Sequence, residues 1–336
     1  MIHALRAGAF VLAIGFSFLS GAAAFPRGIF VSGPPASARS TSVLPSLAGK
    51  DFVAGYLVRI DWASLEPEEG RCDMALLDRE LAAARAVGKQ VALAVVNGAH
   101  VPPWLWDRGA ASVQVPVRGR GVQRIALPWD EVYLAAWCRF VGQLGKHAAS
   151  HPSLVLVHIT HATLNGFEMQ LAFSPTEEAA WREAGYTAAK HLASWQRVVA
   201  TFGAAFPTLP LDVEVHPVLG DDAIARGVVA FGRRELGERF GVFGAWWSPR
   251  NAEVYAGMFA LLQEAAAARR GTAQLVASET PNRWNPRGGL GEGGLGKALD
   301  FGLEKGLRYF EVWETDLLNA GLEAKMTEVA KRCGEP

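Results

Sequence analysis

The alternation of short apolar runs with helical patterns constrains the fold of this chain more than any other feature. Eight runs rich in β-branched and aromatic residues recur along it, and each is typical of a strand buried on both faces. The runs cover residues 27–32, 54–60, 89–96, 154–160, 211–216, 240–246, 273–278 and 308–313. The sequence therefore predicts eight buried strands distributed over most of the chain.

Helical patterns separate these runs. The strongest start signal is Ser174-Pro175-Thr176-Glu177, which combines an N-cap, a proline at the first helical position and a glutamate three residues after the cap. The expected helices cover residues 73–87, 130–149, a segment beginning at 174, 221–236, 251–269, 295–305 and 316–332. The first run differs, because the Pro- and Ser-rich stretch that follows it predicts a loop.

Eight strands that alternate with helices predict a (β/α)8 barrel, here a single domain over residues 25–336. A doubly wound open sheet is the alternative. That fold would require a G-x-G-x-x-G turn between a strand and a helix to bind a dinucleotide, and no run is followed by one. In a barrel the carboxyl ends of all strands meet at one face, so we expect functional residues there.

The first 24 residues have the pattern of a secretory signal peptide. Arg6 precedes an apolar stretch over residues 7–19, and Ala22-Ala23-Ala24 forms a small-residue cleavage site. The alternative, an uncleaved membrane anchor, is disfavoured because a spanning helix needs roughly 20 apolar residues. We expect cleavage near Ala24, export to the periplasm or the medium, and a mature protein without a membrane span.

Charge and cysteine content exclude several kinds of partner. Lys and Arg number 33, Asp and Glu also number 33, and no basic block offers a binding surface for nucleic acid or an anionic membrane. Neither C-x-x-C nor a Cys/His spacing typical of metal ligands occurs. We therefore expect a neutral partner, such as an oligosaccharide or a polysaccharide, and predict neither a metal site nor a cofactor.

Acids and indoles dominate the residues that end the predicted strands or lie in the loops beyond them. Eight of the 11 Trp residues fall in these positions, where flat apolar rings can stack on the C–H faces of sugars. The alternative for any single indole is that it plugs the top of the barrel. The candidates for substrate binding are Arg59, Asp61, Trp62, Asn97, His100, Asn165, His216, Trp246, Trp247, Trp313 and Glu314.

Glu168 and Glu279 are the best candidates for a catalytic pair. They follow the fourth and seventh strands, which lie across the barrel mouth from each other. Glycoside hydrolysis needs two carboxyl groups, because one protonates the departing oxygen while the other attacks the anomeric carbon or activates water. The sequence thus predicts a glycoside hydrolase.

One stretch of sequence resembles a known group of enzymes. The run from Arg59 to Gly70, RIDWASLEPEEG, is followed by LLD at 76–78, GKQV at 88–91 and PPWL at 102–105. Over residues 55–106 the chain resembles the retaining (β/α)8-barrel glycoside hydrolases of clan A, particularly the β-galactosidase-like branch. The likeness elsewhere is limited to the strand pattern and to isolated residues at strand ends.

The resemblance implies a retaining two-carboxylate mechanism. It makes Glu168 the acid/base, Glu279 the nucleophile, Arg59 the support of the nucleophile and Trp313 the platform under the reactive sugar. The clan usually has Asn directly before the acid/base, whereas here Asn165 precedes Glu168 by three positions. Either the loop is rebuilt around an intact site or Glu168 is not the acid.

Other polar residues have structural interpretations. We expect Glu66 to belong to a solvated turn and His158 to be a hydrogen-bonded core residue, while Glu214 is either a buried contact or a substrate ligand. Glu314 is the reserve candidate for a catalytic acid. Two other functional classes stay open: a barrel that binds carbohydrate without turnover, and a metal-dependent hydrolase, which lacks clustered His ligands here.

Overall fold

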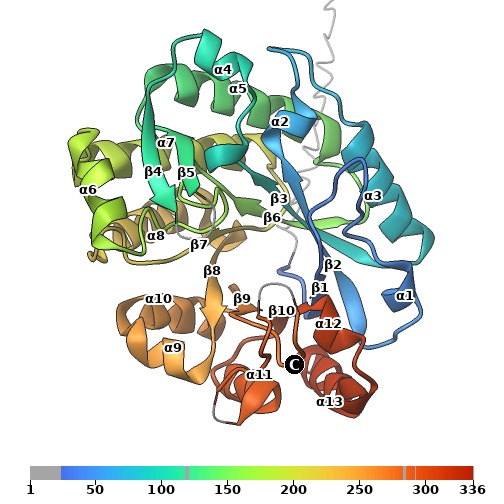
Figure 1. Ribbon diagram of the computed structural model, residues 1–336. Coiled ribbons are helices and arrows are strands. Elements are labelled where there is room, and N and C mark those ends of the chain that lie inside the picture. The colour runs from blue at the N-terminus through green and yellow to red at the C-terminus, as the bar shows by residue number, and fades with distance from the viewer. Residues whose placement is uncertain (1–23, 118–120, 283–284, 292, 336) are drawn as a thin grey trace, which may run out of the picture.

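Eight parallel strands close into a barrel in the computed structural model, which describes residues 24–117, 121–282, 285–291 and 293–335 (Figure 1). Around the barrel the strands are ordered β1-β10-β9-β8-β7-β6-β3-β2, so neighbours in the chain are neighbours in the sheet. The barrel strands are β1 (Gly28–Ser32), β2 (Val53–Asp61), β3 (Gln90–Val96), β6 (Leu154–Ile159), β7 (Leu211–Glu214), β8 (Phe240–Trp247), β9 (Gly271–Leu275) and β10 (Tyr309–Trp313). The predicted (β/α)8 barrel is confirmed.

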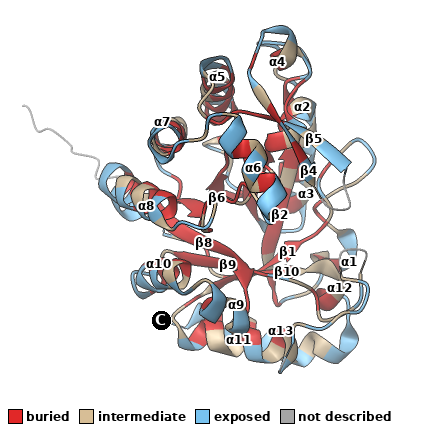
Figure 2. Ribbon diagram, turned by 60° about the vertical axis from the view of Figure 1, so that its left-hand side comes forward, coloured by how far each residue is buried: buried red, intermediate tan, exposed pale blue. Residues whose placement is uncertain are grey.

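Helices surround the barrel, with their buried faces towards the strands and their exposed faces outwards (Figure 2). The capping box at Ser174 is present as expected, with reciprocal bonds between the Ser174 and Glu177 side chains and the backbone. The α-helices are α1 (Pro45–Ala48), α2 (Trp62–Leu65), α3 (Ala75–Ala86), α4 (Trp104–Asp107), α5 (Glu131–Ala148), α6 (Pro175–Glu183), α7 (Ala188–Ala205), α8 (Ala223–Leu236), α9 (Pro249–Val254), α10 (Ala256–Ala267), α11 (Gly294–Glu304), α12 (Glu314–Leu317) and α13 (Glu323–Gly334). Three short 3₁₀ turns are η1 (Gly98–His100), η2 (Gly237–Arg239) and η3 (Ala320–Leu322).

The structure differs from the sequence expectation in a few elements. An antiparallel hairpin, β4 (Ser112–Val117) with β5 (Gly121–Ala126), lies between β3 and α5 and was not predicted. Its signal is the alternation of Val113, Val115 and Ile125, which are buried, with polar residues. The segment expected as one helix over 251–269 is divided between α9 and α10, and β9 ends three residues earlier than expected, at Leu275.

The amino end of the barrel is closed by apolar packing. Phe25 packs beneath an interior cluster that includes Phe30, Leu156 and Phe243. Gly241 is required beside it, because a Cβ atom there would lie 2.5 Å from the Phe25 ring. A ligand therefore has access to the barrel interior from the carboxyl ends of the strands.

A polar network crosses the barrel interior and is centred on His158 of β6. The Nδ1 atom of His158 lies 2.6 Å from Asp212 Oδ1, and its Nε2 atom lies 3.1 Å from Glu311 Oε1. Burial lowers the pKa of His158, but the two carboxylates outweigh it and raise the pKa to about 10. Tyr309 and Gln274 donate hydrogen bonds to Glu311. His158 is therefore the core histidine that the sequence predicted.

The predicted signal peptide falls almost entirely on residues 1–23, outside the described residues. Of the helices that the structure does describe, none combines the length and the apolar character needed to cross a bilayer.

Candidate active site

A cavity of about 680 Å³ opens at the carboxyl end of the barrel. Every barrel strand contributes to its wall at or just beyond its last residues, as expected for a (β/α)8 barrel. The lining residues are Pro35, Arg59, Asp61, Val96, His100, Gln123, Asn165, Phe167, Glu168, Gln170, Phe173, His216, Ala245, Trp246, Asn251, Tyr255, Gln274, Val276 and Trp313. Seven of the predicted site residues other than Glu168 are among them: Arg59, Asp61, His100, Asn165, His216, Trp246 and Trp313.

Glu168 reaches this cavity because the loop after β6 folds back across the loop after β3. Gly166 adopts a φ of +71°, and a Cβ atom on it would lie 2.4 Å from the Asn97 backbone. The Asn165 side chain accepts hydrogen bonds from the N–H groups of Phe167 and Glu168, at 3.0 and 2.9 Å. Phe167 then points into the barrel interior and Glu168 into the cavity. Asn165 therefore holds the backbone at Glu168 from three positions earlier.

The electrostatic environment of Glu168 favours its protonated form. Burial, and next the negative charge of Glu214, raise the pKa of Glu168 to about 6, against the opposing effects of His216, Asn165 and Arg59. Gln170 donates a hydrogen bond of 2.6 Å to Oε2 of Glu168. A carboxyl group with this pKa can donate a proton near neutral pH, which is the property required of a general acid.

Charged groups at the carboxyl end of β2 also line the wall, with only β3 between β2 and β6 in the barrel. Arg59 donates a hydrogen bond of 2.6 Å to the Gly33 carbonyl, and its positive charge acts on Glu168. The Asp61 carboxylate lies 3.2 Å from Nδ1 of His100. Arg59 was expected to support Glu279; the structure places its charge near Glu168.

Only part of the predicted indole set lines the cavity. Trp246 and Trp313 do, and their Nε1 atoms donate hydrogen bonds to the carbonyls of Val215 and Leu275, at 2.8 Å each. These bonds fix the orientation of the two rings. Trp284 lies outside the described residues.

Trp62 and Trp247 do not line the cavity, which corrects their predicted role in substrate binding. Both are fully buried between the barrel and its helices. Trp62 packs at 5.0 Å from the ring of Trp137, and Trp247 stacks at 5.4 Å on Phe301. The register of β8 against β9 shifts by one residue between Gly244 and Trp247. At this irregularity Trp246 lies on the cavity wall next to Ala245, while Trp247 faces the helices.

The structure does not bring Glu279 into the cavity. Because β9 ends at Leu275, the chain has left the barrel wall before residue 279, and the Glu279 carboxylate accepts hydrogen bonds from the N–H groups of Leu290 and Leu295, both at 3.2 Å. Leu295 lies in the first turn of α11, where a negative charge is favourable. These contacts hold the loop before α11. The expected pairing of Glu168 and Glu279 across one cavity is not observed.

Two further candidates also lie away from the cavity wall. Asn97 is fully buried, and its Nδ2 atom donates a hydrogen bond of 3.0 Å to the Tyr133 hydroxyl. Glu314 begins α12 and is not a lining residue. Asn97 therefore contributes to the loop that carries Glu168, and not to substrate contact.

The Glu-rich turn after β2 has a structural role. Glu66 is fully buried, which corrects its expected place in a solvated turn. Its carboxylate accepts hydrogen bonds from Trp62 Nε1 at 2.9 Å and from the Gly70 N–H at 2.7 Å, and it pairs with Arg139. Trp62 and Glu66 are four residues apart, about one helical turn, and this spacing brings the indole N–H to the carboxylate.

Several lining residues were missed by sequence analysis. Phe173, Tyr255 and Gln123 come from loops or from the unpredicted hairpin, so no strand-end rule points to them. Phe173 is 68% exposed, which is unusual for a phenylalanine and places an apolar ring at the rim. Gln274 lies on β9 and could have been found by counting alternate residues along that strand.

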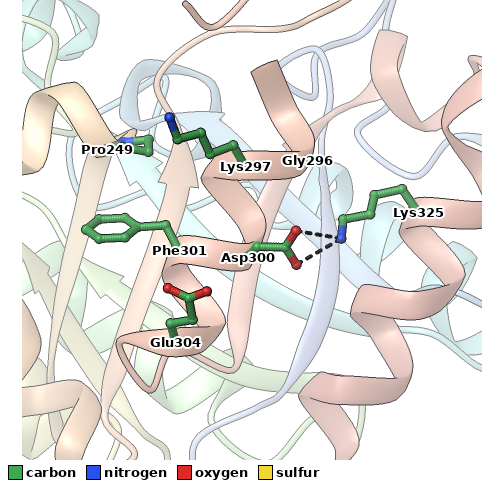
Figure 3. Close-up of a pocket in the computed structure, with 7 residues that line it drawn as sticks. All are labelled: Pro249, Gly296, Lys297, Asp300, Phe301, Glu304 and Lys325. Carbon is green, nitrogen blue, oxygen red and sulfur yellow. Dashed lines mark hydrogen bonds and ion pairs between the residues drawn. The ribbon is translucent and has the colours of Figure 1, made fainter. Parts of the chain in front are cut away.

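A second hollow lies outside the barrel, between α9, α11 and α13, and is formed by charged residues (Figure 3). Asp300 there accepts hydrogen bonds of 2.8 Å from Lys325, and Arg332 also pairs with it. The charges neutralise each other, and no strand end reaches this surface. In the described part of the chain, no group of three or more His, Cys, Asp or Glu residues is placed to hold a metal ion.

A parallel barrel that presents a carboxyl group of raised pKa beside indole rings has the architecture of the barrel glycoside hydrolases. Sequence comparison agrees: residues 53–198 match the β-galactosidase family, glycoside hydrolase family 42. This match covers less than half of the chain. No curated protein sequence matches the chain.

Solved structures with the same fold include a β-galactosidase and the catalytic domain of a β-amylase. The β-galactosidase from the psychrophilic Marinomonas ef1 is 14% identical with a TM-score of 0.57, over 91% of this chain and 59% of that one. The β-amylase catalytic domain from Paenibacillus polymyxa is 11% identical with a TM-score of 0.58, over 94% of this chain and all of that one. The chain thus spans little more than half of the β-galactosidase. The comparisons confirm the resemblance to β-galactosidase-like glycoside hydrolases and support an enzyme of this class.

Proposed function

We propose that this chain hydrolyses the glycosidic bonds of an oligosaccharide or polysaccharide, with Glu168 as the proton donor. The observation that carries the proposal is the position of Glu168, a carboxyl group with a pKa raised to about 6, in a cavity that Trp246 and Trp313 also line. The names of the structural relatives make β-galactosides the first substrates to test.

The experiment compares Glu168→Gln with the wild type on two substrates. An aryl β-galactoside with an activated leaving group needs no proton, whereas an alkyl galactoside or a disaccharide does. We expect kcat/KM of the variant to fall by a factor of about 10²–10⁴ on the alkyl galactoside or the disaccharide, and by much less on the aryl β-galactoside. Equal losses on both substrates would contradict the role of Glu168 as the acid.

We propose a retaining mechanism, and two residues are candidates for the nucleophile. The resemblance favours Glu279, while the cavity favours Asp61, the only carboxylate besides Glu168 on the described wall. Retention requires carboxyl groups about 5–5.5 Å apart, and inversion about 6.5–9.5 Å. NMR of the first-formed anomer decides between retention and inversion, and Asp61→Asn against Glu279→Gln identifies the residue whose loss abolishes turnover.

A carbohydrate-binding barrel without turnover is the second candidate. It is favoured by the contacts of Glu279, whose carboxylate holds the loop before α11. Binding of β-galactosides to the wild type in calorimetry, without release of any sugar, would establish this alternative.

We also propose that the protein is exported and cleaved near Ala24. The support is the sequence pattern of residues 1–24. N-terminal sequencing of the protein recovered from the periplasm or the medium should begin at or near Phe25. A mature protein that retains Met1 would reject cleavage.

A further inference from the structure

A buried carboxylate lies directly behind the cavity wall. Glu214 is the last residue of β7, is 3% exposed and does not line the cavity. Its Oε2 atom accepts a hydrogen bond of 2.8 Å from the N–H of Met169, and its Oε1 atom lies 2.7 Å from Nδ1 of His216. Glu214 thus contacts the residue next to Glu168 in the chain and also a lining imidazole.

The Met169 contact fixes the loop that carries Glu168. On one side, the Asn165 side chain accepts hydrogen bonds from the backbone N–H groups of Phe167 and Glu168. On the other side, the Glu214 carboxylate accepts a hydrogen bond from the next N–H along the chain, that of Met169. Without this acceptor, the buried N–H of Met169 would lose its hydrogen-bond partner, which destabilises the loop.

The same carboxylate acts electrostatically on Glu168. The charged and titratable groups near Glu168 are Glu214 from β7, His216 just beyond it, and Arg59 from β2. Tyr255 lies between α9 and α10, and burial followed by the charges of Glu214 and Glu168 raises the pKa of its hydroxyl. After burial, Glu214 makes the largest contribution to the raised pKa of Glu168. Glu214 also opposes the effect of burial on His216 and raises the pKa of that imidazole.

We propose that Glu214 is a positioning residue for the proton donor: it anchors the Glu168 loop through Met169, and its buried negative charge favours the protonated form of Glu168. His216 shares this charge and lies between Glu214 and the cavity. The inference rests on the proposed function, because it assigns Glu168 as the acid. It resolves the alternative left open for Glu214 in favour of a buried contact.

The test is Glu214→Gln, which keeps an acceptor oxygen at the same distance and removes the charge. We expect the alkaline limb of the kcat/KM profile, where the acid loses its proton, to move to lower pH by roughly one unit. At pH values above the limb, this shift corresponds to about a tenfold loss of kcat/KM. An unmoved limb would overturn the proposal.

Glu177→Gln is the matched control. Glu177 is also a buried carboxylate that accepts backbone N–H groups, those of Phe173 and Ser174, but it does not act on the charge of Glu168. We expect a lower melting temperature with the limb at the wild-type pH. If the alkaline limb of the kcat/KM profile moved equally in Glu214→Gln and Glu177→Gln, the role of Glu214 would be structural only.

Glu214→Asp is the second variant, for the case in which Glu214→Gln does not fold. It keeps the charge and withdraws the carboxylate from Met169 by one methylene. We expect kcat to fall while the limb stays within a few tenths of a pH unit of the wild type; a limb displaced as far as one unit would contradict the proposal.

Failure of the proposed function can be distinguished from failure of this inference. If the wild type releases no sugar, the proposed function fails, and ¹³C NMR of protein labelled at glutamate carboxyls still reports the titration of Glu168. A Glu168 pKa that is the same in Glu214→Gln and in the wild type would overturn the electrostatic role of Glu214 whether or not the protein is an enzyme.

Discussion

Trp246 and Trp247 are neighbours on β8 and have different roles. Trp246 lines the cavity, whereas Trp247 packs against α11 and donates a hydrogen bond of 2.9 Å to the Ala298 carbonyl. A one-residue shift in the register of β8 against β9, just before Trp247, places the two indoles in different layers. Position at a strand end therefore predicts where an indole lies along the barrel, but not which face it occupies.

Substitution of two indoles should separate binding from stability. Trp313→Ala is expected to weaken oligosaccharide binding and the accompanying quenching of tryptophan fluorescence, because its ring lines the cavity. Trp247→Phe is expected to leave binding intact and to lower the free energy of unfolding by about 1–3 kcal/mol, through a lost hydrogen bond and a small void. Fluorescence titration and urea unfolding measure the two effects; weaker binding in Trp247→Phe alone would contradict the assignment.

At the scale of elements, the loop after β6 decides whether the site forms. The loop crosses η1 so closely that Gly98 and Gly166 both have positive φ and contact backbone across the crossing. The Asn97 N–H donates a hydrogen bond of 3.2 Å to the Gly166 carbonyl and joins the two loops. Glu168 is thereby positioned by backbone packing beyond the end of its strand.

Gly166→Ala should damage this crossing. The added Cβ atom would lie 2.4 Å from the Asn97 backbone, so the loop has to move. We expect a loss of unfolding free energy well above the about 1–2 kcal/mol of left-handed strain, together with weaker sugar binding. Gly185→Ala is the control, because Gly185 has a φ of +84° with open space around it. Equal losses in thermal unfolding would show that the crossing is not tight.

At the scale of the whole molecule, buried imidazoles couple stability to pH. His161 and His191 stack at 6.2 Å between the barrel and α7, and both are fully buried. Burial lowers the pKa of His191 to about 3, and burial followed by the charge of His191 lowers that of His161 well below its usual range. The unfolded chain binds more protons below its ordinary histidine pKa of about 6.5, so the folded state loses stability as pH falls from there towards 3.

His191→Phe should reduce the acid sensitivity of the protein. Between pH 7 and pH 5 each neutral imidazole contributes a loss of about 2 kcal/mol, and the variant should be spared one such contribution. Urea unfolding at both pH values measures the difference. An unchanged dependence in His191→Phe would show that this imidazole is solvated or paired in the folded protein.

The sequence by itself determined the number and order of the barrel strands, because a strand buried on both faces requires a run of apolar residues and each run is local in the chain. It also pointed to the strand ends as the site, and to Glu168, Trp246 and Trp313 within it. Only the tertiary structure decided which strand-end residues face the cavity. Trp247 turns away because the register of β8 against β9 shifts just before it, and the Glu279 carboxylate accepts hydrogen bonds from the N–H groups of Leu290 and Leu295. Both are contacts between segments that no local pattern encodes.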